Sequence, residues 1–97
     1  MIVTSDSQVL KTKEQMVLRE EFDDWAILFD PDTGRAMGIS PTGATIWKCL
    51  ASDAKLDVQA IAGTLREEYD GIPDTVDTEI LEFIDSVRKH GYVEERS

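Results

Sequence analysis

The sequence is poor in basic residues, and this shortage argues against one large class of partners. Lysine and arginine together number 10 against 20 acidic residues, so the formal net charge is -10. Nucleic-acid binding draws much of its affinity from basic side chains that release counterions from phosphates. The charge balance therefore disfavours DNA and RNA, and it suits a basic or neutral partner.

Side chains that carry catalysis or bind metals are equally scarce. Cys49 is the single cysteine and His90 the single histidine, so no internal disulfide and no paired Cys/His metal set is available. Cys49 falls on the apolar face of one expected helix and His90 at the end of another, which does not favour a nucleophilic pair. A packing cysteine and a histidine at a helix C-terminus are the simpler interpretations. We therefore expect no catalytic residue, no metal and no cofactor.

Glycine-rich phosphate-binding loops are also missing. No G-x-G-x-x-G precedes an expected helix, and no Walker lysine is present. The segment Asp30-Pro31-Asp32-Thr33-Gly34 resembles the start of a calcium loop, but it lacks the oxygen ligand at the fifth position and the downstream glutamate. Its proline and glycine instead favour a hairpin turn.

Long apolar runs are absent, which bears on location and on domain organisation. No stretch approaches the roughly 20 apolar residues of a membrane span, and the first residues do not have the pattern of a secretory signal. Together with the single cysteine, this favours the cytosol. A chain of 97 residues suits one domain. We expect a flexible tail over residues 1–13, with a short strand at Val9-Leu10, and one domain over residues 14–97.

The first half of that domain has the pattern of strands. Residues 16–20 are compatible with a strand, residues 22–24 favour a turn, and residues 25–29 are rich in aromatic and branched side chains. After the Asp30–Gly34 turn, residues 35–39 form a third short strand. Three strands joined by short turns predict an antiparallel meander with the third strand at an edge.

The second half has helical periodicity. Ser40 and Pro41 are typical of a helix start, and the first helix is expected over residues 42–51. A second helix is expected over residues 57–69, and a third over residues 74–90, ending at glycine 91. The apolar stripe of the third helix, expected to face the core, comprises Val76, Ile80, Phe83, Ile84 and Val87. Three strands followed by three helices give an α+β fold, an order that also fits a winged helix-turn-helix variant.

Two runs of residues carry a family resemblance. Residues 28–35 are L-F-D-P-D-T-G-R, and residues 39–47 are I-S-P-T-G-A-T-I-W. Together they resemble the PqqD family, named for protein D of pyrroloquinoline quinone biosynthesis. Its pattern is a D-P-x-T-G-type turn followed by an L-N-P-x-G-x-x-I-W-like phrase, in which Ile39-Ser40 here replace Leu-Asn. Weaker matches continue through residues 61–69, 80–84 and 90–92, so the resemblance spans about residues 16–94.

This resemblance implies a function. PqqD-like domains are winged helix-turn-helix domains that bind the leader of a ribosomally made precursor peptide. They deliver that peptide to a modifying enzyme, often a radical S-adenosylmethionine (SAM) enzyme. This chain lacks the cysteines for an iron–sulfur cluster, so it is not expected to be that enzyme. The precursor, the enzyme and the oligomeric state stay open. The alternatives are a winged-helix nucleic-acid-binding or regulatory domain and a small enzyme.

The expected peptide site combines the edge strand with the third helix. An uncovered edge accepts an extended chain by β-augmentation, and the candidates are Arg35, Ala36, Met37, Gly38 and Ile39. A shortened edge that Arg35 simply protects is the alternative. On the third helix, a stripe flanking the core stripe is expected to form the wall of the groove; it comprises Asp77, Leu81, Ile84 and Arg88.

Overall fold

The computed structural model describes residues 2–3, 9–21, 25–52 and 56–96. Within them, the elements follow the order β1 (Ile2–Val3), β2 (Val9–Thr12), β3 (Val17–Glu20), β4 (Ala26–Asp30), β5 (Arg35–Ile39), α1 (Pro41–Ala51), α2 (Val58–Glu68), α3 (Val76–Lys89) and β6 (Val93–Arg96). The expected α+β class, with three antiparallel strands followed by three helices, is confirmed. The turn expected at residues 22–24 lies outside the described residues.

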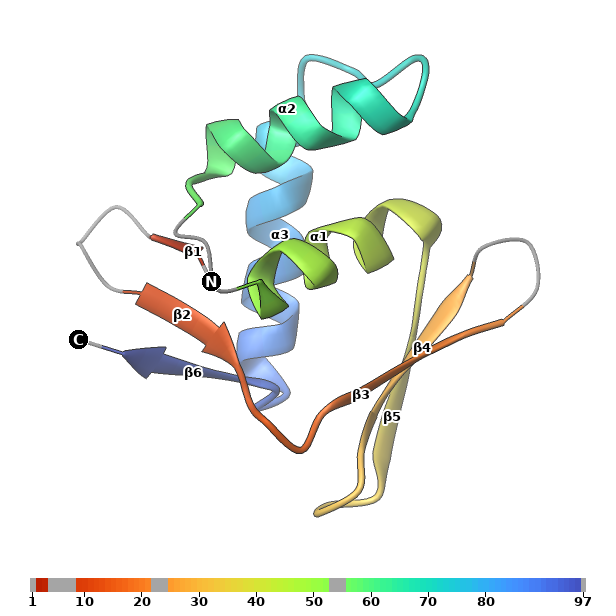
Figure 1. Ribbon diagram of the computed structural model, residues 1–97, viewed down its shortest axis with the longest axis vertical. Coiled ribbons are helices and arrows are strands. Elements are labelled where there is room, and N and C mark those ends of the chain that lie inside the picture. The colour runs from red at the N-terminus through yellow and green to blue at the C-terminus, as the bar shows by residue number, and fades with distance from the viewer. Residues whose placement is uncertain (1, 4–8, 22–24, 53–55, 97) are drawn as a thin grey trace.

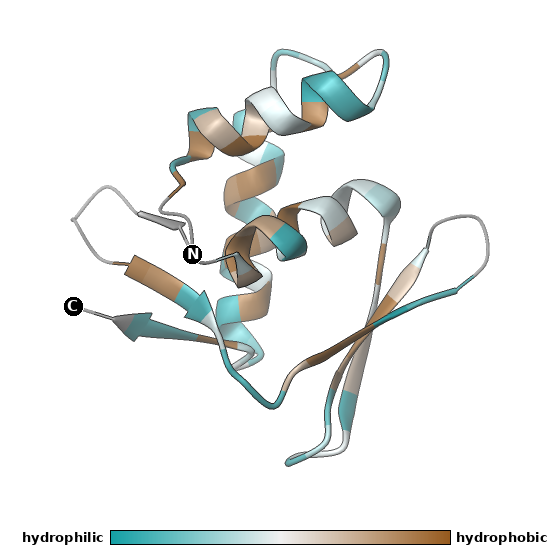
Figure 2. Cartoon of the chain, in the orientation of Figure 1, coloured by the Kyte–Doolittle hydropathy of each residue, from teal (hydrophilic) through white to brown (hydrophobic). Residues whose placement is uncertain are grey.

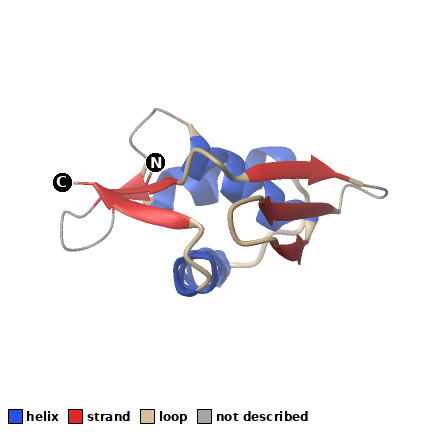
Figure 3. Cartoon of the chain, turned by 90° about the horizontal axis from the view of Figure 1, so that it is seen from below, coloured by secondary structure: helices blue, strands red, loops and turns tan. Residues whose placement is uncertain are grey.

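Two small antiparallel sheets flank the helices. One has the order β3-β4-β5 and the other the order β1-β2-β6. In Figure 1 they lie on opposite sides of α3, and the view from below in Figure 3 shows the same separation. The first sheet is the predicted meander, and β5 is one of its edges. The second sheet brings the two ends of the chain together, since Leu10 pairs with Glu95 and Thr12 with Val93.

The turn between β4 and β5 forms as its residues predict. The Asp30 carbonyl accepts a hydrogen bond from the Gly34 N–H at 2.8 Å, and the Asp30 carboxylate accepts one from the Asp32 N–H at 2.9 Å. Gly34 has a φ of 75°, in the region that glycine occupies without steric cost. The turn sets the β4–β5 register, in which Leu28 pairs with Met37.

Local capping explains where the first two helices begin. Ser40 is the N-cap of α1, and its hydroxyl accepts from the Gly43 N–H at 3.2 Å, with Pro41 in the first helical position. Asp57 caps α2 by accepting from the Ala60 N–H at 2.8 Å. Neither start departs by more than one residue from the predicted one.

The third helix depends on a different set of local features. It has no side-chain cap, but acidic residues in its first turn and basic ones in its last complement the helix dipole. It ends before Gly91, whose φ is 76°. The Gly91 N–H then donates to the Arg88 carbonyl at 3.0 Å and the Tyr92 N–H to the Val87 carbonyl at 2.9 Å, as in a glycine-terminated helix end.

The core lies where the three helices meet the inner faces of both sheets. Brown, apolar segments of the helices face one another in Figure 2. Side chains that are almost completely buried come from both sheets, all three helices and the turn after α3: Leu10, Leu28, Leu50, Ile61, Leu65, Ile80, Val87 and Tyr92. None of the helices in the described ranges is long and apolar enough to cross a membrane.

The prediction of a flexible tail over residues 1–13 does not fit residues 9–12, which the structure describes as a strand. The short strand expected at Val9-Leu10 exists, but it extends to Thr12 and pairs with β6. Leu10 is only 1% exposed and belongs to the core. The sequence prediction missed this because β6, the partner strand, is four residues long and charged, so nothing in its composition marks it as a strand.

Candidate peptide-binding site

Strand β5 presents a free edge with little charge. It pairs with β4 on one side, and no other described strand pairs with the opposite side. Arg35, Ala36 and Gly38 are exposed, Met37 is half-buried and Ile39 is buried. The strand therefore offers unpaired backbone N–H and C=O groups to an extended guest. Met37 and Ile39 lie on the face of the strand that points toward the interior of the protein.

One flank of α3 lies beside β5. The Ser86 hydroxyl approaches the Met37 sulfur at 4.0 Å, a weak contact that nevertheless fixes which side of the helix faces the strand. One turn earlier, Phe83 is half-buried and packs against the core. A Cβ atom at Gly43 would lie 3.2 Å from Phe83 Cε2, so the glycine makes room for the ring.

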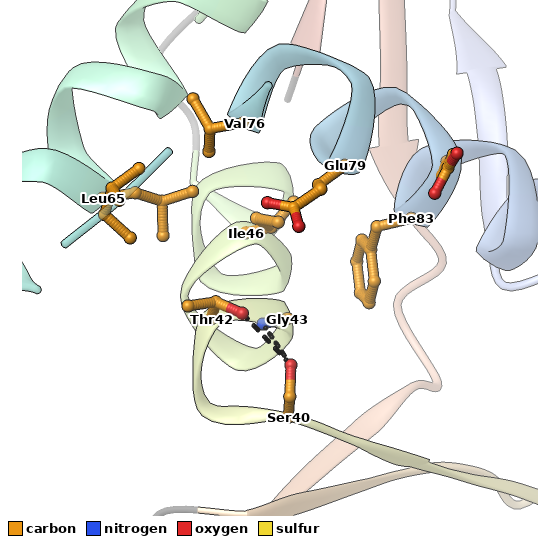
Figure 4. Close-up of a pocket in the computed structure, with 10 residues that line it drawn as sticks. Ser40, Thr42, Gly43, Ile46, Leu65, Val76, Glu79 and Phe83 are labelled. Atoms are coloured by element: carbon orange, nitrogen blue, oxygen red, sulfur yellow. Dashed lines mark hydrogen bonds between the residues drawn. The ribbon is translucent and has the colours of Figure 1, made fainter. Parts of the chain in front are cut away.

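A hollow opens at the Ile39 end of β5, between α1 and α3; we call it the end hollow. Its volume is about 360 Å³. Ser40, Thr42, Gly43 and Ile46 line it from the β5–α1 corner, and Val76, Glu79, Glu82 and Phe83 line it from α3. Figure 4 shows Phe83 and Glu79 extending from α3 toward α1, with Ile46 beside Glu79 in this view. Leu65 and Ile72 complete the lining, so the end hollow lies close to the Ile39 end of β5, although no residue of β5 itself lines it.

The structure places the predicted helix wall elsewhere. The Asp77 carboxylate accepts a hydrogen bond from the Gln59 side chain on α2 at 2.9 Å, and Arg88 forms an ion pair with Glu95 on β6. Leu81 is 54% exposed. At 100° per residue, Asp77 lies on the opposite side of α3 from Ser86, and Leu81 and Arg88 share the side of Asp77. Ile84 is a core residue, 4% exposed.

A symmetry of the helical pattern explains why the predicted residues do not lie beside β5, and their contact with a peptide stays a prediction. The core stripe of α3 has two flanks, and the sequence shows an exposed apolar residue, Leu81, on only one of them. Periodicity does not tell which flank faces β5. Phe83, which was assigned to the core stripe, forms the apolar part of the flank that does. The structure thus brings Arg35–Ile39 together with Glu79, Glu82, Phe83 and Ser86, and it does not bring Asp77, Leu81 and Arg88 to the strand.

Three residues of this site could have been recognised from the sequence. Gly43 lies one turn after the Ser40 cap, where a glycine inside a helix normally has a packing reason. Glu79 lies three residues before Glu82 and four before Phe83, so on a helix it neighbours both. Nothing in the sequence, however, shows that this face meets the edge strand.

The single cysteine, Cys49, packs in the core, and the single histidine, His90, is the C-cap of α3. Cys49 is buried, and burial, with a smaller effect of the Glu68 carboxylate, raises the pKa of its thiol. A raised pKa keeps the thiol protonated and weakly nucleophilic at neutral pH. The His90 ring lies 2.8 Å from the Ser86 carbonyl, one turn back on α3. Among the described residues, no group of three or more His, Cys, Asp or Glu side chains could hold a metal ion.

Strand β3, at the opposite edge of the same sheet, carries charged side chains. On β3, Arg19 forms an ion pair with Glu21, and Glu20 forms one with Lys48 of α1. The hydrogen bond and charge of Glu20 raise the pKa of Lys48. Because inserted charges discourage strand addition, β3 is the poorer of the two edges for a guest.

Comparisons with known proteins agree with this architecture. No curated protein matches this sequence. The structure of TbiB1 in complex with the TbiA(beta) leader peptide is similar with a TM-score of 0.68 and 23% identity, covering 87% of this chain and 94% of that one. A lasso peptide synthetase B1 complexed with its leader peptide is similar with a TM-score of 0.70 and 16% identity, covering 89% of this chain and 98% of that one.

These two likenesses establish the fold. The family follows from the sequence itself, because the model of the family described as coenzyme PQQ synthesis protein D matches residues 26–93, well over half of the chain. The match begins with β4 and ends at the start of β6, so it includes the β4–β5 hairpin, all three helices and the end hollow between them. The chain belongs to the PqqD family.

Proposed function

We propose that this protein is a non-catalytic adaptor that binds the leader of a ribosomally made precursor peptide and presents it to a separate modifying enzyme. The observation that carries the proposal is the weakly charged free edge of β5 beside the Phe83–Ser86 flank of α3. The leader adds to β5 as a fourth strand, and its backbone pairs with the outward-facing groups of Arg35–Ile39. Alternate side chains of the guest then face α3.

The relatives support this assignment by their architecture. Both similar solved structures hold leader peptides, and both share the fold of this chain. The modifying enzyme that the PqqD family implies is a radical SAM enzyme, and we include that partner in the proposal. A cytosolic location also belongs to it, since a single buried cysteine fits a reducing compartment.

The nucleic-acid alternative has less support. In a winged helix-turn-helix protein that binds DNA, the recognition helix needs free basic side chains to contact phosphates. On α3, Lys89 forms an ion pair with Asp85 at 3.0 Å and Arg88 forms one with Glu95. Glu79 and Glu82 are exposed on the same helix, so its surface repels a phosphate backbone.

A proline scan of β5 tests the proposal against the leader peptide of a precursor encoded beside this gene. Consecutive residues of a strand direct their N–H groups to opposite sides. Of Ala36→Pro and Met37→Pro, one therefore removes a bond to β4 and the other removes only an outward donor. We expect the variant that keeps the thermal stability of the wild type to lose leader binding, measured by fluorescence anisotropy.

The same scan on the opposite edge is the matched control. Leu18→Pro and Arg19→Pro probe β3 in the same way, and the variant that remains folded should bind the leader as the wild type does. A labelled DNA duplex, titrated in parallel, should not bind. If the folded β5 variant binds the leader with unchanged affinity, or if only the β3 variant loses binding, the site is not β5.

A further inference from the structure

The end hollow combines an apolar floor with an acidic rim. Ile46 and Val76, both at most 4% exposed, form part of its floor. Glu79 and Glu82 come from successive turns of α3 and are exposed at its rim. The residues that line the hollow include no lysine, arginine or histidine. No ion pair joins either glutamate to another residue in the described ranges.

This combination selects among guest side chains by their chemistry. An acidic side chain in the hollow would meet two carboxylates of the same sign. A purely apolar side chain would fill the floor, but it would give the two carboxylates at the rim no opposite charge. Lysine and arginine have apolar stems that lie along apolar surface while the charged end stays at the rim.

We propose that the end hollow binds a lysine or arginine of the leader peptide, with its stem on the Ile46–Val76 floor and its cation between Glu79 and Glu82. This inference rests on the proposed function, since the guest strand on β5 must bring the side chain to the hollow. The hollow begins at Ser40, directly after the last residue of β5. One basic residue at one end of the paired segment therefore fixes the register of the guest on the strand.

The size of the effect follows from the exposure of the two carboxylates. Exposed ion pairs contribute about 0.2–1 kcal/mol, which corresponds to about a 1.4-fold to fivefold change in affinity for each carboxylate. The contribution should fall with added salt, because exposed charges are screened over about 10 Å at 0.1 M ionic strength. The apolar stem contact should not depend on salt.

A random peptide library provides a probe that does not require the natural leader. Peptides of 15 residues are displayed and selected on the wild-type protein, and those that also bind the folded β5 proline variant are discarded. We expect the remaining peptides to share a lysine or arginine at one fixed position. The same selection on the Glu79→Gln, Glu82→Gln double variant should lose this preference. Glu67→Gln, an exposed site on α2 outside the hollow, is the matched control and should retain it.

One selected peptide then allows a quantitative cycle. Replacing its basic residue by norleucine keeps an apolar stem and removes the charge. In the wild type this replacement should weaken binding about twofold to thirtyfold, and in the double variant it should have little effect. An equal loss in both proteins, or a shared apolar or acidic residue at that position, overturns the inference and leaves β5 binding intact. If no peptide binds in a β5-dependent way, the proposed function fails together with it.

Discussion

At the scale of single residues, Phe83 and Leu81 are two apolar side chains of α3 with different surroundings. Phe83 is half-buried beside Gly43 and lines the end hollow. Leu81 is 54% exposed on the side of the helix that carries Asp77 and Arg88. The proposed guest can reach the first and not the second, so the pair separates the two flanks of α3 experimentally.

Alanine variants of these two residues should differ in peptide binding. Phe83→Ala removes apolar contact with the guest, and we expect leader affinity to fall about tenfold or more. Its stability should fall by roughly 1–3 kcal/mol, less than the 3–5 kcal/mol typical of a fully buried phenylalanine. Leu81→Ala should change the stability by less than about 0.5 kcal/mol and leave the affinity unchanged. Thermal melts and titrations measure both quantities. A loss of affinity in Leu81→Ala alone would restore the wall predicted from the sequence.

The sequence predicted the roles of some residues, such as helix caps, and not those of others, such as the wall of the site. The caps Ser40 and Asp57 were predictable, because capping depends on side-chain oxygens within three residues of the N–H groups they bind. The wall of the site was not predictable, because periodicity places residues around one helix and carries no information about its neighbours. Peptide contact at Arg35–Ile39 remains a prediction.

At the scale of elements, the β4–β5 hairpin presents the proposed binding edge, and its two glycines have different roles. Gly34 has a φ of 75°, whereas Gly38 lies in the strand without a positive φ. A Cβ atom would meet no heavy atom within 4 Å at either position. The two sites therefore differ in backbone conformation and not in available space.

Alanine substitution at the two glycines should have opposite effects on stability. Gly34→Ala forces a left-handed conformation on a residue with a Cβ atom, at a cost of about 1–2 kcal/mol. Gly38→Ala restricts the unfolded chain without strain and should stabilise the protein by about 0.4–1 kcal/mol. Urea unfolding at equilibrium measures both changes. If Gly38→Ala destabilises the protein as much as Gly34→Ala, then Gly38 does not have a strand conformation with room for a Cβ atom.

Sequence patterns predicted helices and strands better than they predicted the binding site or the pairing of distant strands. The meander and all three helices follow from local turn residues, caps and periodicity. Strand β6 was missed, since its sequence, Val-Glu-Glu-Arg, forms a strand only by pairing with β2 from the other end of the chain. Long-range pairing of short charged segments leaves no local pattern to detect.

At the scale of the whole molecule, the second sheet ties the ends of the chain to the core. Leu10 on β2 is 1% exposed, and Val93 on β6 is 7% exposed. Just after β2, the Lys13 N–H donates a hydrogen bond to the Tyr92 carbonyl at 3.1 Å. Residues 9–13 are therefore part of the folded unit.

Truncating Leu10 should consequently destabilise the whole protein. Leu10→Ala removes a fully buried side chain, and we expect a loss of about 2–5 kcal/mol in the free energy of unfolding. Glu14→Ala, exposed four residues later, is the matched control and should stay within about 0.5 kcal/mol of the wild type. Chemical denaturation followed by tryptophan fluorescence measures both. Equal stability of Leu10→Ala and the wild type would mean that β2 is a loose tail after all.

Amide hydrogen exchange with and without the leader peptide tests most directly whether the leader pairs with β5. A guest strand on β5 bonds to its outward-facing N–H groups, and these belong to alternate residues of Arg35–Ile39. Exchange should slow at those alternate amides on adding the peptide, while the amides of Val17–Glu20 on β3 should exchange at their original rates. Slowed exchange on β3 with no change on β5 would contradict pairing at β5.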